Sequence, residues 1–123
     1  GCVGFFSLEM SDTQLVNRMS AARTGISVNR IMAGGFGFDD FQELKKAKDD
    51  IAALPIYIED TPAQTISAIR AKARRLKRRK NLRLLVVDYL QLVRPSHQRR
   101  NANRDTEISE ITQGLKALAK ELN

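Results

Sequence analysis

The chain has 123 residues, a net charge of +7 and 42% hydrophobic residues, which indicates one small globular domain or part of one and excludes a disordered chain. The single cysteine, Cys2, excludes an internal disulfide, and with one histidine it gives too few ligands for a zinc cluster, so we expect a reducing compartment. No run approaches the roughly 18 apolar residues of a membrane span, so we expect a cytoplasmic protein without a membrane partner.

A short apolar run over residues 3–8 begins the chain and predicts a buried strand, because it is too short for a helix. Glu9 follows this run directly. The first residue is not Met and the apolar run starts almost at once, so we expect the sequence to be a piece of a longer protein.

Three helices are predicted between residues 11 and 55, because apolar residues recur there at helical spacing. The first is expected to be capped by Ser11 or Asp12 and to stop at Gly25. The second is expected to be capped by Ser27, to cover residues 28–32 and to close at the Gly34-Gly35 pair. The third is expected to start at Asp39 or Asp40 and to end at Pro55. The third helix is expected to bury one apolar face, made of Phe41, Leu44, Ala47, Ile51 and Leu54.

A second strand at residues 56–58 and a strongly basic helix after Thr65 are predicted next. Eight of the eleven residues from 70 to 80 are Arg or Lys, and residues 61–104 carry 13 basic and one acidic side chain. Such a block fits either contact with nucleic-acid phosphates or a solvated helix face. For the helix itself the solvated face is the favoured interpretation.

A third strand is predicted at residues 82–87, without polar alternation, as in a strand covered on both sides. A polar, basic loop over 94–104 and a last helix over 107–122 follow. Strands that alternate with helices predict an α/β fold, with a parallel sheet and helices on both faces. Three strands make a small sheet, so its faces need neighbours from further sequence, from the chain itself or from another chain.

Two carboxylates follow predicted strands. Asp88 stands at the C-terminal end of its strand, where open α/β sheets bind ligands and a carboxylate can hold Mg²⁺, although many such residues only cap a helix or form a turn. Glu9 can position a water molecule, or it is an ordinary acid before a helix. If the two strands are parallel neighbours, Glu9 and Asp88 emerge at one edge of the sheet.

Four segments resemble the DnaB-like family of replicative DNA helicases, in the C-terminal domain. They are SLEMS at 7–11, LPIYIEDTP at 54–62, VVDYLQL at 86–92 and LKALAKEL at 115–122. Their order and spacing also match that family, and together they extend over nearly the whole chain.

The resemblance implies an incomplete RecA-like P-loop NTPase core over residues 1–123, belonging to a motor that unwinds duplex DNA by moving 5′ to 3′ on single-stranded DNA. It implies ATP and Mg²⁺ as cofactors, a ring of six copies, and a helicase loader and primase as partners. Glu9 matches the glutamate that activates the attacking water, and Asp88 matches the aspartate associated with Mg²⁺. Gln91 either senses the nucleotide or stabilises a turn.

By this resemblance, the basic loop would lie where RecA-like rings face single-stranded DNA in their central channel. The arginines expected to hold its phosphates are Arg94, Arg99, Arg100 and Arg104. No aromatic residue is interleaved with them, which favours contact with the DNA backbone and no sequence preference.

One feature of the family is missing from the sequence. No Gly-rich loop ending in Gly-Lys-Ser/Thr occurs in the 123 residues, so we expect the isolated chain to be inactive although its parent protein is an enzyme. Two alternatives stay open: a fragment of a RecA-like recombinase, and a stand-alone basic nucleic-acid-binding module.

Overall fold

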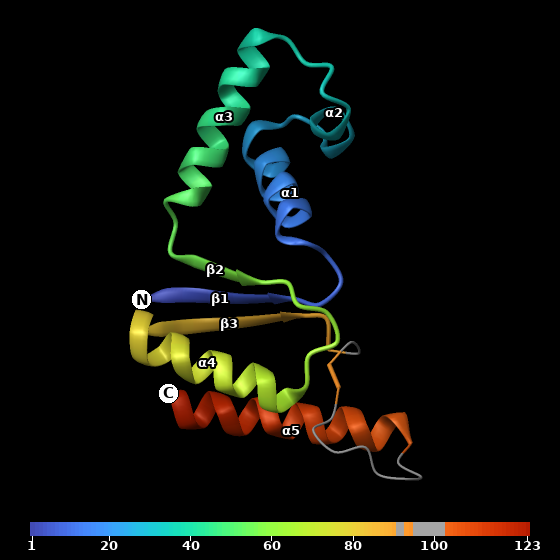
Figure 1. Ribbon diagram of the computed structural model, residues 1–123, viewed down its shortest axis with the longest axis vertical. Helices are drawn as coiled ribbons and strands as arrows, with labels where there is room; N and C mark the ends of the chain where they lie inside the picture. The colour runs from blue at the N-terminus through green and yellow to red at the C-terminus, as the bar shows by residue number, and fades with distance from the viewer. Residues whose placement is uncertain (91–92, 95–102) are drawn as a thin grey trace. The chain divides into compact units, whose positions relative to one another are not determined.

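The computed structural model describes residues 1–90, 93–94 and 103–123. Its helices and strands, drawn in Figure 1, are in chain order β1 (Cys2–Ser7), α1 (Asp12–Thr24), α2 (Val28–Ala33), α3 (Phe38–Ala52), β2 (Ile56–Glu59), α4 (Ile66–Lys80), β3 (Leu82–Asp88) and α5 (Arg104–Leu122). The chain forms two compact units, unit 1 with residues 1–9 and 56–123, and unit 2 with residues 10–55.

Unit 1 is built on a three-stranded parallel sheet in the order β2-β1-β3. The central strand β1 pairs with β2 through Phe5 and Ile58 and with β3 through Phe5 and Val86. The strands β2 and β3 lie on either side of β1, and α4 forms the connection that joins them along the chain. The predicted α/β class with a parallel sheet is confirmed.

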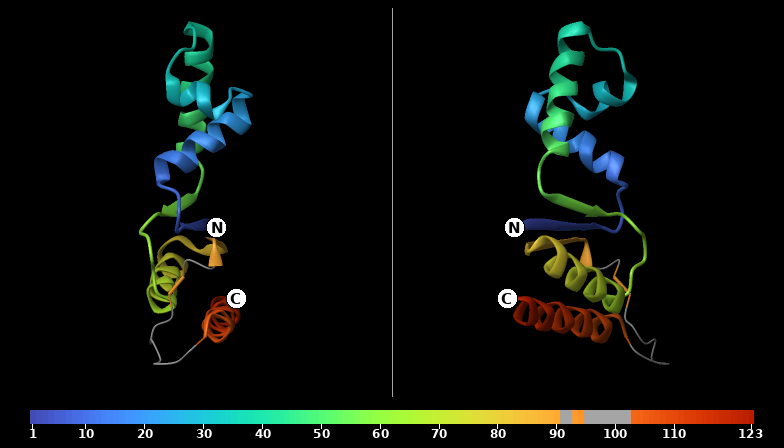
Figure 2. Two further views of the ribbon diagram at one scale, coloured as in Figure 1. Left: turned by 90° about the vertical axis from the view of Figure 1, so that its right-hand side faces the viewer. Right: turned by 60° about the vertical axis from the view of Figure 1, so that its left-hand side comes forward.

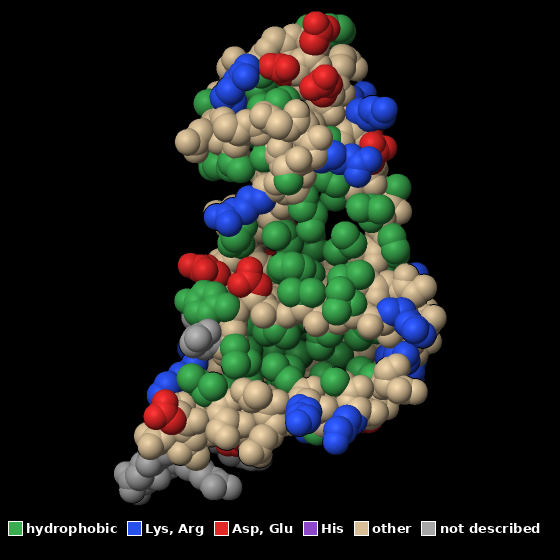
Figure 3. All heavy atoms as spheres, turned by 180° about the vertical axis from the view of Figure 1, so that it is seen from behind, with side chains coloured by type: hydrophobic (Ala, Val, Ile, Leu, Met, Phe, Trp, Pro, Cys, Tyr) green, Lys and Arg blue, Asp and Glu red, His purple; other side chains and the backbone are tan. Residues whose placement is uncertain are grey.

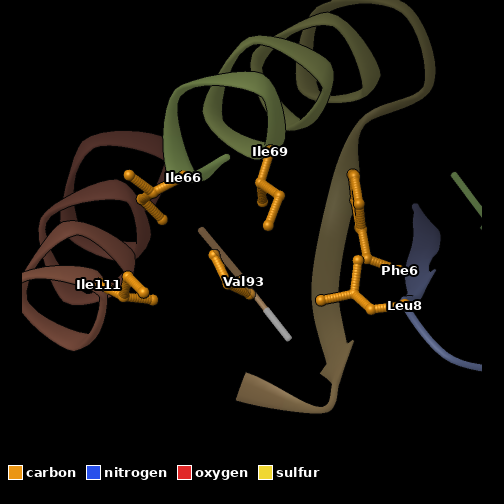
Figure 4. Close-up of a cluster of buried hydrophobic side chains, with 6 residues drawn as sticks. All are labelled: Phe6, Leu8, Ile66, Ile69, Val93 and Ile111. Carbon is orange, nitrogen blue, oxygen red and sulfur yellow. The ribbon is translucent and has the colours of Figure 1, made fainter. Parts of the chain in front are cut away.

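The core of unit 1 lies between the sheet and the pair α4 and α5, which run side by side in both views of Figure 2. Side chains of β1 alternate, and its Phe6 points into this core (Figure 4). The buried members of the larger cluster are Phe6, Leu8, Ile66, Ile69, Val93 and Ile111. No helix in the described ranges is long and apolar enough to cross a membrane.

The opposite face of the unit 1 sheet is apolar but partly exposed. Leu84 of β3 is 55% exposed, so the expectation that residues 82–87 are covered on both sides is wrong for the described chain. Leu84 lies on the same face as Val3 of the central strand, its pairing partner, which is also only partly buried, so this face lacks the cover that α4 and α5 give the other one. The free edge of β3 borders an apolar groove of about 400 Å³ that α5 lines through Leu115, Leu118 and Leu122. Hydrophobic side chains gather on the surface seen in Figure 3.

Unit 2 consists of α1, α2 and α3 around a small core of Ile26, Ile31 and Leu44. The predicted caps are confirmed for α1 and α2, because the side chains of Ser11 and Ser27 each accept a backbone hydrogen bond in the first turn.

The predicted start and end of α3 are wrong by a few residues. Its N-cap is Gly37, without a side-chain hydrogen bond, and Asp39 lies inside the first turn. The helix ends at Ala52 rather than at Pro55. Leu54 therefore lies outside the helix and is 44% exposed instead of contributing to the buried face.

Candidate functional site

The carboxyl ends of the three strands in unit 1 meet at one edge of the sheet, because all three strands are parallel. Ser7 at the end of β1 pairs with Asp88 at the end of β3. The backbone N–H of Leu8 donates to the carbonyl oxygen of Asp88 over 2.8 Å, which keeps the two chain segments together beyond the last strand residue. The predicted shared edge for Glu9 and Asp88 is thus confirmed.

Glu9 and Asp88 are both exposed at this edge, so neither carboxylate is taken up by the core. The peptide bond after Asp88 is cis. Within the described ranges no group of three or more His, Cys, Asp or Glu side chains is placed to hold a metal ion. Mg²⁺ needs no such cage, since it is commonly bound through one or two carboxylates together with substrate phosphates and water. Exposed carboxylates at a strand-end edge fit that mode of binding.

A third carboxylate at the same edge, Glu59, was not among the residues singled out from the sequence. It ends β2, and its Oε1 accepts from the Thr61 hydroxyl over 2.5 Å and lies 3.0 Å from Nζ of Lys72 in α4. The hydrogen bond from Thr61 and the ammonium of Lys72 hold the pKa of Glu59 below its ordinary value of 4.5, although partial burial opposes them. In the sequence, Glu59 stands in a run of turn-forming residues at 59–62, and this pattern does not indicate that its partner is Lys72, 13 residues further on.

Arg94 lies beyond the end of β3, next to the fully buried Val93. Its backbone forms an isolated parallel bridge with Thr65, the N-cap residue of α4. Gln91, Arg99 and Arg100 lie outside the described residues.

Arg104 was expected in the loop, but the structure places it in the first turn of α5. The helix starts three residues earlier than predicted because the side chain of Asn103 accepts from the N–H of Thr106 over 2.8 Å and acts as N-cap. The guanidinium of Arg104 lies 3.1 Å from the carboxylate of Glu107. A DNA contact by Arg104 therefore has to compete with an ion pair inside its own helix.

Several basic residues of α4 have partners in other elements of unit 1. Arg74 forms a bidentate pair with Glu121 of α5, at 2.7 and 2.9 Å. Lys77 donates to the carbonyl oxygen of Leu82, and the ammonium of Lys80 lies 5.9 Å from the ring centre of Tyr57. Several basic residues of α4 thus contact other elements of unit 1, whereas the sequence favoured a helix face that only solvent contacts.

Comparison with known proteins gives one consistent family. A family model described as the DnaB-like helicase C terminal domain matches residues 1–123. The replicative DNA helicase DnaB of Rickettsia felis is 50% identical over 121 residues, which are 98% of this chain and 24% of that protein. The corresponding protein of Geobacillus stearothermophilus is 46% identical over 120 residues, 98% of this chain and 26% of that protein. The chain therefore spans about a quarter of the length of these curated relatives.

Solved structures are similar to the chain over nearly its whole length. One of them, described as an ATPase domain, superposes with a TM-score of 0.88 at 32% identity, covering 98% of this chain and 43% of that one. A DnaB-like replicative helicase, described with its interactions with primase, superposes with a TM-score of 0.87 at 32% identity, covering 98% and 29%. The arrangement of strands and helices is thus that of a DnaB-like ATPase domain.

Proposed function

This chain belongs to the DnaB-like helicase C-terminal domain family, and from that premise we propose that it is part of the ATP-driven motor of a replicative DNA helicase. The observation that carries the proposal is the family match over all 123 residues. Residues 1–123 are then an incomplete RecA-like ATPase domain. In the described residues β3 is an outer strand and borders an apolar groove, which fits a sheet that continues in further sequence. The family match favours this function over a recombinase fragment and over a stand-alone basic module.

In this proposal the two carboxylates at the strand-end edge have different roles. Glu9 orients the attacking water and accepts its proton, for which an exposed carboxylate beside the sheet edge is suited. Asp88 would hold Mg²⁺, directly or through water, and the bound ion would neutralise negative charge on the phosphates of ATP, as phosphoryl transfer requires. Gln91 is proposed to respond to the bound nucleotide.

We propose that the motor moves along single-stranded DNA and binds it through its phosphates, without sequence preference. The proposed contacts are Arg94, Arg99, Arg100 and Arg104. The parent protein is proposed to act in the cytoplasm as a ring of six copies, with a helicase loader and a primase as partners. Support for the primase comes from the DnaB-like helicase whose interactions with primase are described.

The test is a Glu9→Gln variant of the longer protein that contains this chain. We expect ATP turnover to fall by about 100-fold or more, because general base catalysis typically contributes that much, while binding of single-stranded DNA is retained. Glu43→Gln, a matched change at an exposed residue of unit 2, should leave turnover unchanged. Full turnover in the Glu9→Gln protein would remove the proposed role of this residue.

The isolated 123-residue chain should hydrolyse ATP no faster than its own Glu9→Gln variant, because the sequence lacks the Gly-rich loop that cradles phosphates. Phosphate release from the two purified chains, measured side by side, tests this. Clear turnover that depends on Glu9 would contradict the expectation.

A further inference from the structure

The segment between β2 and α4 contains a chain of polar contacts that starts at Glu59 and ends at the backbone of Arg94. Nζ of Lys72 bonds to both Oε1 of Glu59, at 3.0 Å, and Oε1 of Gln64, at 3.1 Å. The side-chain nitrogen Nε2 of Gln64 donates to the backbone carbonyl oxygen of Thr61 over 3.0 Å, which closes the turn. These contacts tie the end of β2, the turn and the second turn of α4 together.

Gln64 is the residue through which this network reaches Arg94. It is one of the few buried polar residues in the described chain, with 4% of its surface exposed. Its carbonyl oxygen accepts from the N–H of Arg94 over 2.9 Å, and the carbonyl oxygen of Arg94 accepts from the N–H of Ile66 over 3.0 Å. The backbone of Arg94 is therefore held on both sides by residues 64–66.

The neighbour of Arg94 is fixed by packing as well. Val93 is fully buried and points toward Ile66, Ile69 and Ile111 in the core of unit 1 (Figure 4). Packing fixes the position of Val93, but it leaves open the direction in which the next residue points. The two backbone hydrogen bonds of Arg94 set that direction, and they depend on where the 61–65 turn is held.

We propose that Glu59, Lys72 and Gln64 are positioning residues that fix the backbone of Arg94, so that its exposed guanidinium meets a DNA phosphate. The DNA part of this inference rests on the proposed function, whereas the positioning part does not. The LPIYIEDTP segment at 54–62, which has no part in the proposed roles of Glu9 and Asp88, thereby gains a role through its Glu59.

The physical reason is that buried polar groups need partners. If the acceptor on Glu59 is removed, Lys72 keeps Gln64 as its partner among the described residues, and the side-chain contacts that join the turn to β2 are lost. If the ammonium of Lys72 is removed, the buried Oε1 of Gln64 loses its bond. In either case residues 61–65 gain freedom, and the bonds that hold Arg94 open more often.

The first experiment measures amide hydrogen exchange at Arg94 in the longer protein. Lys72→Met should speed this exchange by about tenfold to 100-fold, as expected when the buried side chain of Gln64 loses a hydrogen bond. Arg74→Met is the matched control, because it removes one positive charge from the same helix but breaks only the pair with Glu121. The amide of Leu8, bonded to Asp88, serves as an internal reference for global unfolding.

Unchanged exchange at Arg94 in Lys72→Met would overturn the positioning role. Equal acceleration at Arg94 and Leu8 would also overturn it, because the residue would then support unit 1 as a whole. Acceleration confined to Arg94, absent from Arg74→Met, is the expected result.

The second experiment separates geometry from charge in DNA binding. Glu59→Ala and Glu59→Gln both remove one negative charge, but only the glutamine keeps an acceptor for Thr61 and Lys72. Charge alone predicts tighter binding to a fluorescent single-stranded oligonucleotide in both variants. Positioning predicts weaker binding in Glu59→Ala, with a salt slope reduced by up to about 0.7, and binding close to the unmodified protein in Glu59→Gln.

Arg94→Ala then separates the positioning of Arg94 from its proposed contact with DNA. If it lowers the salt slope and the Glu59→Ala/Arg94→Ala double variant loses nothing more, the two residues act on one contact. If Arg94→Ala leaves affinity and slope unchanged, the proposed DNA contact of Arg94 is wrong. The exchange experiment still decides the positioning role in that case, because it involves no DNA.

Discussion

Unit 1 contains 15 basic and eight acidic residues, whereas unit 2 contains six of each, so unit 1 carries the whole net charge of +7. Every residue singled out for chemistry also belongs to unit 1. Its strands come from distant parts of the chain, and its larger core cluster joins the sheet to α4 and α5. Unit 2 is a continuous segment of three helices with three buried hydrophobic residues in its cluster.

The difference between the two units indicates two ways in which a sequence determines structure. In unit 2, local signals determine the bounds of α1 and α2, each of which begins after a serine cap and ends at a glycine. Unit 1 depends on contacts between residues far apart in sequence, and these contacts bring the strand ends and the carboxylates to one edge. A site that needs several side chains together is expected in the second kind of unit.

The largest effect that tests this comparison is a core deletion in each unit. Ile69→Ala in unit 1 removes a fully buried side chain from the larger cluster, so we expect the free energy of unfolding to fall by about 3–4 kcal/mol. Leu44→Ala in unit 2 should lower it by about 2 kcal/mol, because a small cluster can close around the cavity more easily.

Urea unfolding followed by circular dichroism measures both values. Leu54→Ala, at a residue 44% exposed, should lower the free energy of unfolding by less than about 0.5 kcal/mol and serves as the control. Equal losses for Ile69→Ala and Leu44→Ala would show that the two cores do not differ in the way described.

Cap deletions should have smaller effects, and similar ones in both units. Ser11→Ala removes the capping box of α1, and Thr65→Ala removes the side-chain cap of α4, so each should lower the free energy of unfolding by about 1 kcal/mol. Ser11→Asp and Thr65→Ser keep an acceptor and should restore most of the loss. If the two alanine variants differ as widely as the core variants, local signals contribute unequally and the comparison must be revised.

Much of the fold could be predicted from the sequence because its signals are local. The caps Ser11, Ser27 and Thr65 were placed correctly, and the strand before Asp88 was found from its apolar run. The shared edge of Glu9 and Asp88 followed from one topological rule, that parallel strands end on the same side.

The remainder depends on pairings that no local pattern encodes. Lys72 reads as one of many basic residues on α4, and only the fold shows that it faces Glu59 and Gln64. The exposure of Leu84 likewise depends on which face of the sheet the helices cover, and an apolar run does not encode that. Arg104 was misplaced because Asn103 was taken as loop chemistry although asparagine also caps helices.

The smallest predicted effect compares one chemical change, Ala to Gly, in both units. Ala63 lies in the turn before Gln64 with φ of 55°, in the left-handed region where a side chain costs about 1 kcal/mol. Glycine removes that strain but gives the unfolded chain more freedom, so Ala63→Gly should raise the free energy of unfolding by less than about 1 kcal/mol. Ala22 is exposed inside α1, where the same change has no strain to relieve and should lower the free energy of unfolding by about 1 kcal/mol. Thermal unfolding of both variants under one set of conditions measures the opposite signs, and a loss of stability in Ala63→Gly would mean that the 61–65 turn is not strained at this residue.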